Sequence, residues 1–71
     1  MSGPACLRLT ERQREVMSLR LDGLGRREVA HRLRIVPKTV RKHIDDARLA
    51  NGAPDELRLL VAYAIELETA S

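Results

Sequence analysis

Residues 36–52 read V-P-K-T-V-R-K-H-I-D-D-A-R-L-A-N-G, and this stretch decides the fold. The proline at its second position favours a helix start, because a proline in the first turn loses no helical hydrogen bond, and the closing glycine favours a helix end. Between them Val40, Ile44 and Ala47 recur at i, i+4 and i+7 and form a narrow apolar seam. The stretch therefore predicts a helix over about 37–50 that packs by this seam and presents cations to solvent.

Signals for three further helices surround this stretch. Thr10 and Gln13 have the spacing of a capping box, which satisfies two backbone donors at a helix start. Gly25 is expected to begin a short second helix that ends only about three residues before Pro37, and two short helices joined so closely are typical of a helix-turn-helix. Pro54 and the two acids after it favour the start of a last helix. The predicted helices span about 11–22, 26–33, 37–50 and 54–67.

Length and composition fit a single small domain. The 71 residues are 44% hydrophobic but only 1% aromatic, with no Trp or Phe, so the core must be aliphatic. Because the aromatic and β-branched runs of strands are missing, we expect an all-α fold. The prediction is a four-helix helix-turn-helix domain over residues 9–68, preceded by a flexible lead-in over residues 1–8, where Gly3 and Pro4 discourage regular structure.

Charge is distributed unevenly along the chain, whose formal net charge is +3. Residues 26–42 contain seven cations and one acid, whereas residues 45–71 contain six acids and two cations. This segregation predicts an anionic partner for the middle of the chain, with Arg26, Arg27, Arg34 and Lys38 neutralising phosphates. No membrane span or signal peptide is evident, and the single Cys6 supports no disulfide, although a reactive thiol stays open. We therefore expect a cytoplasmic protein.

The last predicted helix is apolar around about two-thirds of its circumference. One stripe is expected to face the core, and Leu59, Tyr63 and Leu67 extend the apolar arc beyond it. A surface helix of a small monomer does not need this extra side, so Leu59, Tyr63 and Leu67 are predicted to form a homodimer interface. The alternatives are a tail that folds back over the helix, or a surface that is simply apolar.

Two ordered runs of residues carry a family resemblance. They are Leu9-Thr10-x-Arg12-x-Arg14-Glu15-Val16-Met17 and Gly23-Leu24-x-x-x-Glu28-Val29-Ala30-x-x-Leu33-x-Ile35-x-Pro37-x-Thr39-Val40-Arg41-x-His43-Ile44. In this order they resemble the DNA-binding domain of LuxR/GerE-type transcriptional regulators. The resemblance covers about residues 9–67, and it implies a third helix that reads the major groove and a fourth that mediates dimerisation. Because no receiver or ligand-binding domain is evident, the chain resembles the stand-alone, GerE-like members.

The resemblance also implies roles for single residues. Arg41, Lys42 and Asp45 fall where the family contacts bases, and Lys38 and Thr39 fall where it contacts phosphates. His43 matches a family histidine that orients the domain or contacts the backbone. The two histidines, His31 and His43, lack Cys or acidic companions, so no metal site is predicted, and no other cofactor is expected.

Three departures from the family pattern lie within residues 36–52. Val36 replaces a capping serine, which forfeits about 1 kcal/mol of helix capping. Asn51 replaces a leucine, so the third helix is expected to shift or fray at its end. Asp45 and Asp46 add negative charge near the DNA side, each four residues after a cation. Intrahelical pairing would hold those cations away from phosphate, whereas an Asp45 that accepts from cytosine, beside Arg41 on guanine, would read sequence.

The predicted function is a sequence-specific, dimeric, DNA-binding transcriptional regulator that acts on double-stranded DNA. The alternative is an adaptor that uses the apolar fourth helix to bind RNA polymerase or another regulator. The two acids and the missing cap favour this alternative. An enzyme is not expected, because the chain shows no catalytic residue cluster, phosphate loop or metal-ligand spacing.

Overall fold

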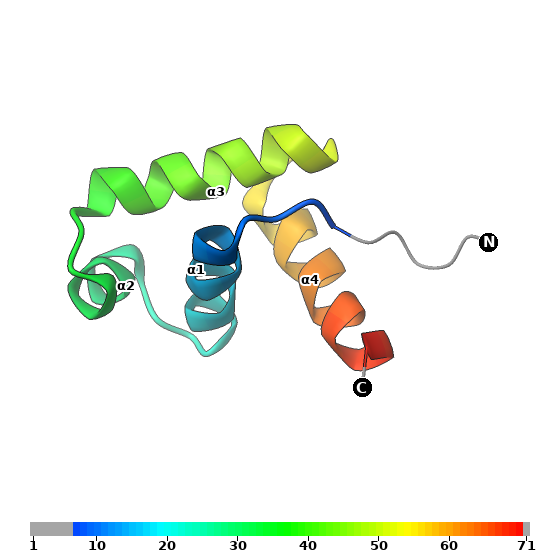
Figure 1. The fold of residues 1–71 in the computed structure, drawn as a ribbon, viewed down its shortest axis with the longest axis horizontal. Coiled ribbons are helices and arrows are strands. Elements are labelled where there is room, and N and C mark those ends of the chain that lie inside the picture. The colour runs from blue at the N-terminus through cyan, green and yellow to red at the C-terminus, as the bar shows by residue number, and fades with distance from the viewer. Residues whose placement is uncertain (1–6, 71) are drawn as a thin grey trace.

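Four helices form the whole of the regular structure in residues 7–70, the part of the chain that the computed structural model describes (Figure 1). The helices are α1 (Glu11–Leu21), α2 (Arg26–Leu33), α3 (Pro37–Asn51) and α4 (Glu56–Ala70). The prediction of an all-α, four-helix helix-turn-helix domain is therefore confirmed. The largest difference is in α4, which begins two residues later than predicted and continues to residue 70.

The helix ends follow the predicted local chemistry. At the start of α1, the Gln13 amide donates to Thr10 Oγ1 at 3.1 Å and the Thr10 amide donates to Gln13 Oε1 at 2.9 Å, which completes the capping box. Pro37 lies in the first turn of α3, and Val36 provides no side-chain cap there. Gly52 takes the left-handed conformation after α3, with φ of 65°. Pro37 and Gly52 set the length of α3, which runs along the top of the view in Figure 1, above the other three helices.

The turn between α2 and α3 depends on a residue that sequence reasoning did not single out for this role. Arg34 adopts a left-handed conformation, with φ of 58°, and the Ile35 amide donates to Ala30 O at 2.9 Å. A side chain in this conformation is disfavoured relative to glycine. The bond from Ile35 closes the end of α2, and half-buried Ile35 packs against the core. The short connection therefore directs the chain from α2 straight into α3.

One aliphatic core holds all four helices. The predicted seam of α3, Val40, Ile44 and Ala47, is buried, which confirms that interpretation. The other buried side chains come from α1, α2 and α4: Val16, Met17, Val29, Ala30, Leu59 and Tyr63. Small Ala30 lies where α2 meets its neighbours, which permits close approach of the helices. The core fixes the orientation of α3, so the opposite side of α3 is left for solvent.

The structure corrects the predicted outer face of α4. Leu59 has no exposed surface and Tyr63 is 3% exposed, so the core of the same chain covers both side chains. Tyr63 Oη also lies 2.7 Å from Ser18 Oγ on α1. The wide apolar arc of α4 is present, but Leu59 and Tyr63 lie on the part of it that faces the core rather than on the part that faces solvent. Of the three residues predicted for a dimer interface, only Leu67 is exposed.

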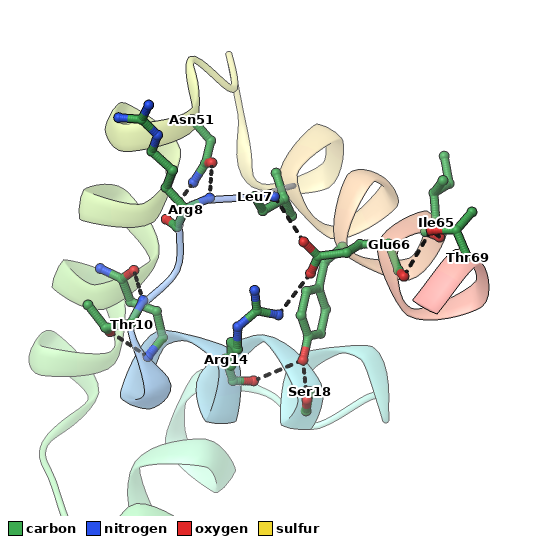
Figure 2. Close-up of polar contacts among 11 residues, drawn as sticks. Leu7, Arg8, Thr10, Arg14, Ser18, Asn51, Ile65, Glu66 and Thr69 are labelled. Carbon is green, nitrogen blue, oxygen red and sulfur yellow. Dashed lines mark hydrogen bonds and ion pairs between the residues drawn. The ribbon is translucent and has the colours of Figure 1, made fainter. Parts of the chain in front are cut away.

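Asn51 and the segment before α1 form a second correction. Asn51 does not fray: it is the last residue of α3, and its amide group joins that helix to Arg8 (Figure 2). Asn51 Oδ1 accepts from the Arg8 amide at 2.6 Å, while Nδ2 donates to Arg8 O at 3.0 Å and to Ala47 O at 2.8 Å. Leu7 packs against the core, so residues 7 and 8 of the predicted lead-in are held in place. Residues 1–6, with Cys6, lie outside the described residues.

Candidate nucleic-acid interface

The solvent-facing side of α3 gathers the residues predicted to contact DNA. Lys38, Arg41 and Lys42 are exposed, and Thr39 and Asp45 are half-buried. Because 3.6 residues make one helical turn, Lys38, Arg41, Lys42 and Asp45 follow each other along one face, opposite the buried seam. The fifteen residues of α3 make it roughly 22 Å long at 1.5 Å per residue, long enough to lie in a major groove.

Two ion pairs of four-residue spacing lie on this face. Arg41 Nε is 3.8 Å from Asp45 Oδ2, and Lys42 Nζ is 3.6 Å from Asp46 Oδ2. The side chains of Arg41 and Lys42 are 68% and 75% exposed, so water screens both pairs. Such pairs contribute only about 0.3–0.5 kcal/mol. They exist as predicted, but they are too weak to withhold either cation from a strongly anionic partner.

Arg48 is a site residue that sequence reasoning missed. Its Nη1 lies 3.2 Å from Asp45 Oδ1, and its Nη2 donates to Pro54 O at 3.0 Å in the turn before α4. Its Nε is buried without a hydrogen-bond partner in the part of the chain that the structure describes. The side chain is 29% exposed, much less than Arg41. The three-residue spacing from Asp45 signalled a pair, but the bond to the turn is not visible in the sequence.

The cations predicted to contact phosphate do not all lie together. Arg26 and Arg41 line one polar hollow, which also includes Arg48 and the beginning of α4. There Arg26 Nη2 lies 3.5 Å from Glu56 Oε1, and Glu56 Oε2 accepts from Arg20 Nε at 2.7 Å. Arg27 lines a different hollow on α2. Arg34 is exposed in the turn directly before α3. Arg26 is therefore partly neutralised, whereas Arg34 and Lys38 lie exposed beside the start of α3.

A polar network ties the last turns of α4 to α1 and to the segment directly before α1 (Figure 2). Glu66 accepts from Arg14 Nη1 at 2.8 Å and from the Leu7 amide at 2.9 Å. The hydrogen bond from Arg14, more than the bond from the Leu7 amide, lowers the pKa of Glu66 below its ordinary value. The same bond raises the pKa of Arg14. This network holds α4 against α1 by its Glu66 side, and it leaves the opposite side of α4 free.

That opposite side of α4 is an apolar surface. Leu57, Val61 and Ile65 are 68%, 48% and 48% exposed and follow each other at four-residue spacing. We call these three residues the outer α4 face. Leu67 is 45% exposed, farther along the helix. The exposed apolar surface that was predicted at Leu59 and Tyr63 is therefore found at the outer α4 face instead.

Neither a metal site nor a membrane span is found among residues 7–70. No group of three or more His, Cys, Asp or Glu side chains in this part of the chain is arranged to hold a metal ion. No helix within it is long and apolar enough to cross a membrane.

Comparison with known families decides the class of the protein. A family model described as bacterial regulatory proteins, luxR family, matches residues 7–48. This match spans α1, α2, the turn at Arg34 and most of α3. The chain belongs to the luxR family. The resemblance to LuxR/GerE-type helix-turn-helix domains is thereby confirmed. No curated protein and no solved structure matches the chain.

Membership of the luxR family makes this a DNA-binding helix-turn-helix domain of a transcriptional regulator, and the family is not one of enzymes. The matched residues include every predicted DNA contact and Arg48 at their end. The outer α4 face lies beyond the matched residues.

Proposed function

We propose that α3 enters the major groove of double-stranded DNA and reads base sequence there. The observation that carries this proposal is the single exposed face with Lys38, Arg41 and Lys42, on a helix of the luxR family whose other face is locked in the core. Arg41 and Lys42 would contact base edges, with Asp45 beside them on the same face, and Lys38, Thr39 and Arg34 would contact phosphates near the start of the helix. Arg26 and Arg27 would add phosphate contacts from α2. Such a regulator would act with the nucleoid in the cytoplasm.

Selection of bound fragments from random DNA tests this proposal. A recovered consensus gives the specific site, and affinity for it is then compared between variants at several salt concentrations. Arg41→Ala is expected to lose about 1–3 kcal/mol on the specific site and to relax the preference at one base pair. Lys38→Ala is expected to weaken binding to all sequences alike and to flatten the salt dependence. Equal losses on specific and random DNA for Arg41→Ala would refute the base-reading role.

We propose further that two copies associate through the outer α4 face. Its three exposed apolar side chains are contiguous along the helix, and contact with a second copy would remove them from water. Val61→Asp is expected to give a folded monomer with reduced affinity for a two-fold symmetric site. Sedimentation measures the mass of the free protein. A wild-type monomer at all concentrations, or an unchanged dimer in Val61→Asp, would contradict this assignment.

The same apolar face supports a second candidate, an adaptor that binds RNA polymerase or another regulator. Salt distinguishes the two functions. Binding to DNA through phosphates falls steeply as salt rises, whereas apolar contact with a protein depends on salt only weakly. An adaptor would also yield no consensus from random DNA.

A further inference from the structure

Asp45 is held from two sides by different cations. Its Oδ1 faces Arg48 Nη1 at 3.2 Å, and its Oδ2 faces Arg41 Nε at 3.8 Å. Arg48 in turn donates to Pro54 O at 3.0 Å, so the chain of contacts begins at the backbone of the turn before α4. The neighbouring pair on α3 is simpler. Among residues 7–70, Asp46 has an ion pair with Lys42 alone.

These contacts differ in how firmly they are fixed. Arg48 is 29% exposed and is bonded to both the turn and Asp45, whereas Arg41 is 68% exposed. Exposed arginine side chains sample many rotamers. Ordering one of them on binding costs entropy and lowers the affinity, and without ordering the guanidinium has no defined orientation. A carboxylate that is also paired with a second, less exposed arginine offers Arg41 a held partner. Asp45 therefore links Arg41 to Arg48, which is hydrogen-bonded to the turn before α4.

Asp45 faces Arg41 at Nε and not at the two terminal nitrogens of the guanidinium. Guanine is read when two guanidinium donors reach O6 and N7 together. Because Asp45 engages the Nε side, the two terminal nitrogens of Arg41 remain available for such a pair of bonds. A carboxylate that already faces two arginines is, by contrast, poorly free to accept from a cytosine amino group.

We propose that Asp45 is a positioning residue: braced by Arg48, it sets the orientation in which Arg41 reads its base. This inference rests on the proposed reading role of α3. It assigns sequence discrimination to Arg48, a residue that need not touch DNA. It also separates Asp45 from Asp46, which lowers affinity by its charge without affecting discrimination.

The first test measures discrimination. The base pair read by Arg41 is the one at which Arg41→Ala loses its preference, and the ratio of affinities for this pair and its replacement is compared between variants. Asp45→Asn and Asp46→Asn remove the same charge from the same helix, so both are expected to bind all DNA a few-fold more tightly. Only Asp45→Asn is expected to lose discrimination, by about 2-fold, which is what an exposed ion pair worth about 0.3–0.5 kcal/mol can supply. Arg48→Met is expected to lose discrimination to a similar extent.

Three results would overturn the proposal. The first is equal discrimination in Asp45→Asn and Asp46→Asn. The second is an Arg48→Met variant that discriminates like wild type although circular dichroism shows that it is folded. The third is a loss of preference at any other base pair when Asp45→Asn is added to Arg41→Ala, because a positioning residue has nothing left to position in that background. That result would make Asp45 a direct reader of its own base.

A measurement without DNA separates this proposal from the proposed function. Nitrogen-15 relaxation at Arg41 Nε reports the order of the side chain in the free protein. The order is expected to fall in Asp45→Asn and Arg48→Met and to stay at the wild-type value in Asp46→Asn. If random DNA yields no consensus, the reading role of α3 fails, and this measurement still decides whether Asp45 orders Arg41. An Arg41 that is equally mobile in all four proteins would refute the positioning role even if a consensus exists.

Discussion

Replacing Leu59 by alanine is expected to destabilise the domain far more than the same change at Leu57. The two leucines lie two residues apart on α4, with 0% and 68% of their surface exposed. Removing about three methylene equivalents from a fully buried site costs ~2.4 kcal/mol of transfer free energy. The cavity left behind brings the loss at Leu59 to about 3–5 kcal/mol. Leu57 has only about a third of its surface covered, so its loss is expected to be about 0.8 kcal/mol.

The assay is urea unfolding followed by helical circular dichroism. A domain of 71 residues has a free energy of unfolding of roughly 4–11 kcal/mol, so Leu59→Ala removes a large part of it. Because self-association adds stability that depends on concentration, the comparison is made at the lowest usable protein concentration. At high concentration Leu57→Ala is expected to lose further stability relative to wild type, since it shortens the outer α4 face. Equal losses for the two variants at low concentration would refute the orientation of α4 described above.

Three further predictions concern residues away from the solvent-facing side of α3. Asn51→Ala is expected to lose about 0.5–1.5 kcal/mol of unfolding free energy, because it removes the hydrogen bonds to the exposed Arg8 backbone, and hydrogen exchange at the Arg8 amide should accelerate. Unchanged protection of this amide would contradict the prediction. Glu66 has a lowered pKa in the folded state, so the stability it contributes is present above its ordinary pKa of 4.5 and is lost as the pH falls through the folded value. Glu66→Gln should therefore unfold more easily than wild type at pH 7, with the difference shrinking in acid, and a gap that widens in acid would reverse the sign. Gly23→Ala is expected to lose about 1–2 kcal/mol in thermal unfolding, because φ of 94° strains any side chain there; an unchanged midpoint would show that the turn adopts another conformation.

Local signals were sufficient to predict the helices. The capping box at Thr10, Pro37 in the first turn of α3 and Gly52 after it act within a few residues, so the sequence alone shows them. The seam of Val40, Ile44 and Ala47 is equally local, because helical periodicity decides which residues share a face. The exposed position of Lys38, Arg41 and Lys42 could be predicted from the same periodicity, because these residues lie on the side of α3 opposite the buried seam.

Contacts between distant residues were not predictable in this way. The apolar arc of α4 is so wide that periodicity cannot say which part meets the core, and the packing of Tyr63 against α1 decides it. The bond from Leu7 to Glu66 spans 59 residues, and the bonds from Arg8 to Asn51 span 43. No pattern within a helix encodes such pairs. Arg48 was missed for the same reason, because its role depends on the carbonyl of Pro54 across a turn.

The bond between the Leu7 amide and Glu66 brings the beginning and the end of the described chain to the same side of the domain (Figure 1). Adjacent ends permit circular permutation, and exposed turns tolerate new ends. Opening the chain at exposed Gly23 and joining residue 70 to residue 7 by a linker would give the order α2, α3, α4, α1. The pair α2 and α3 would stay continuous in that order. The fold of this pair would then not depend on the order in which its supporting helices are synthesised.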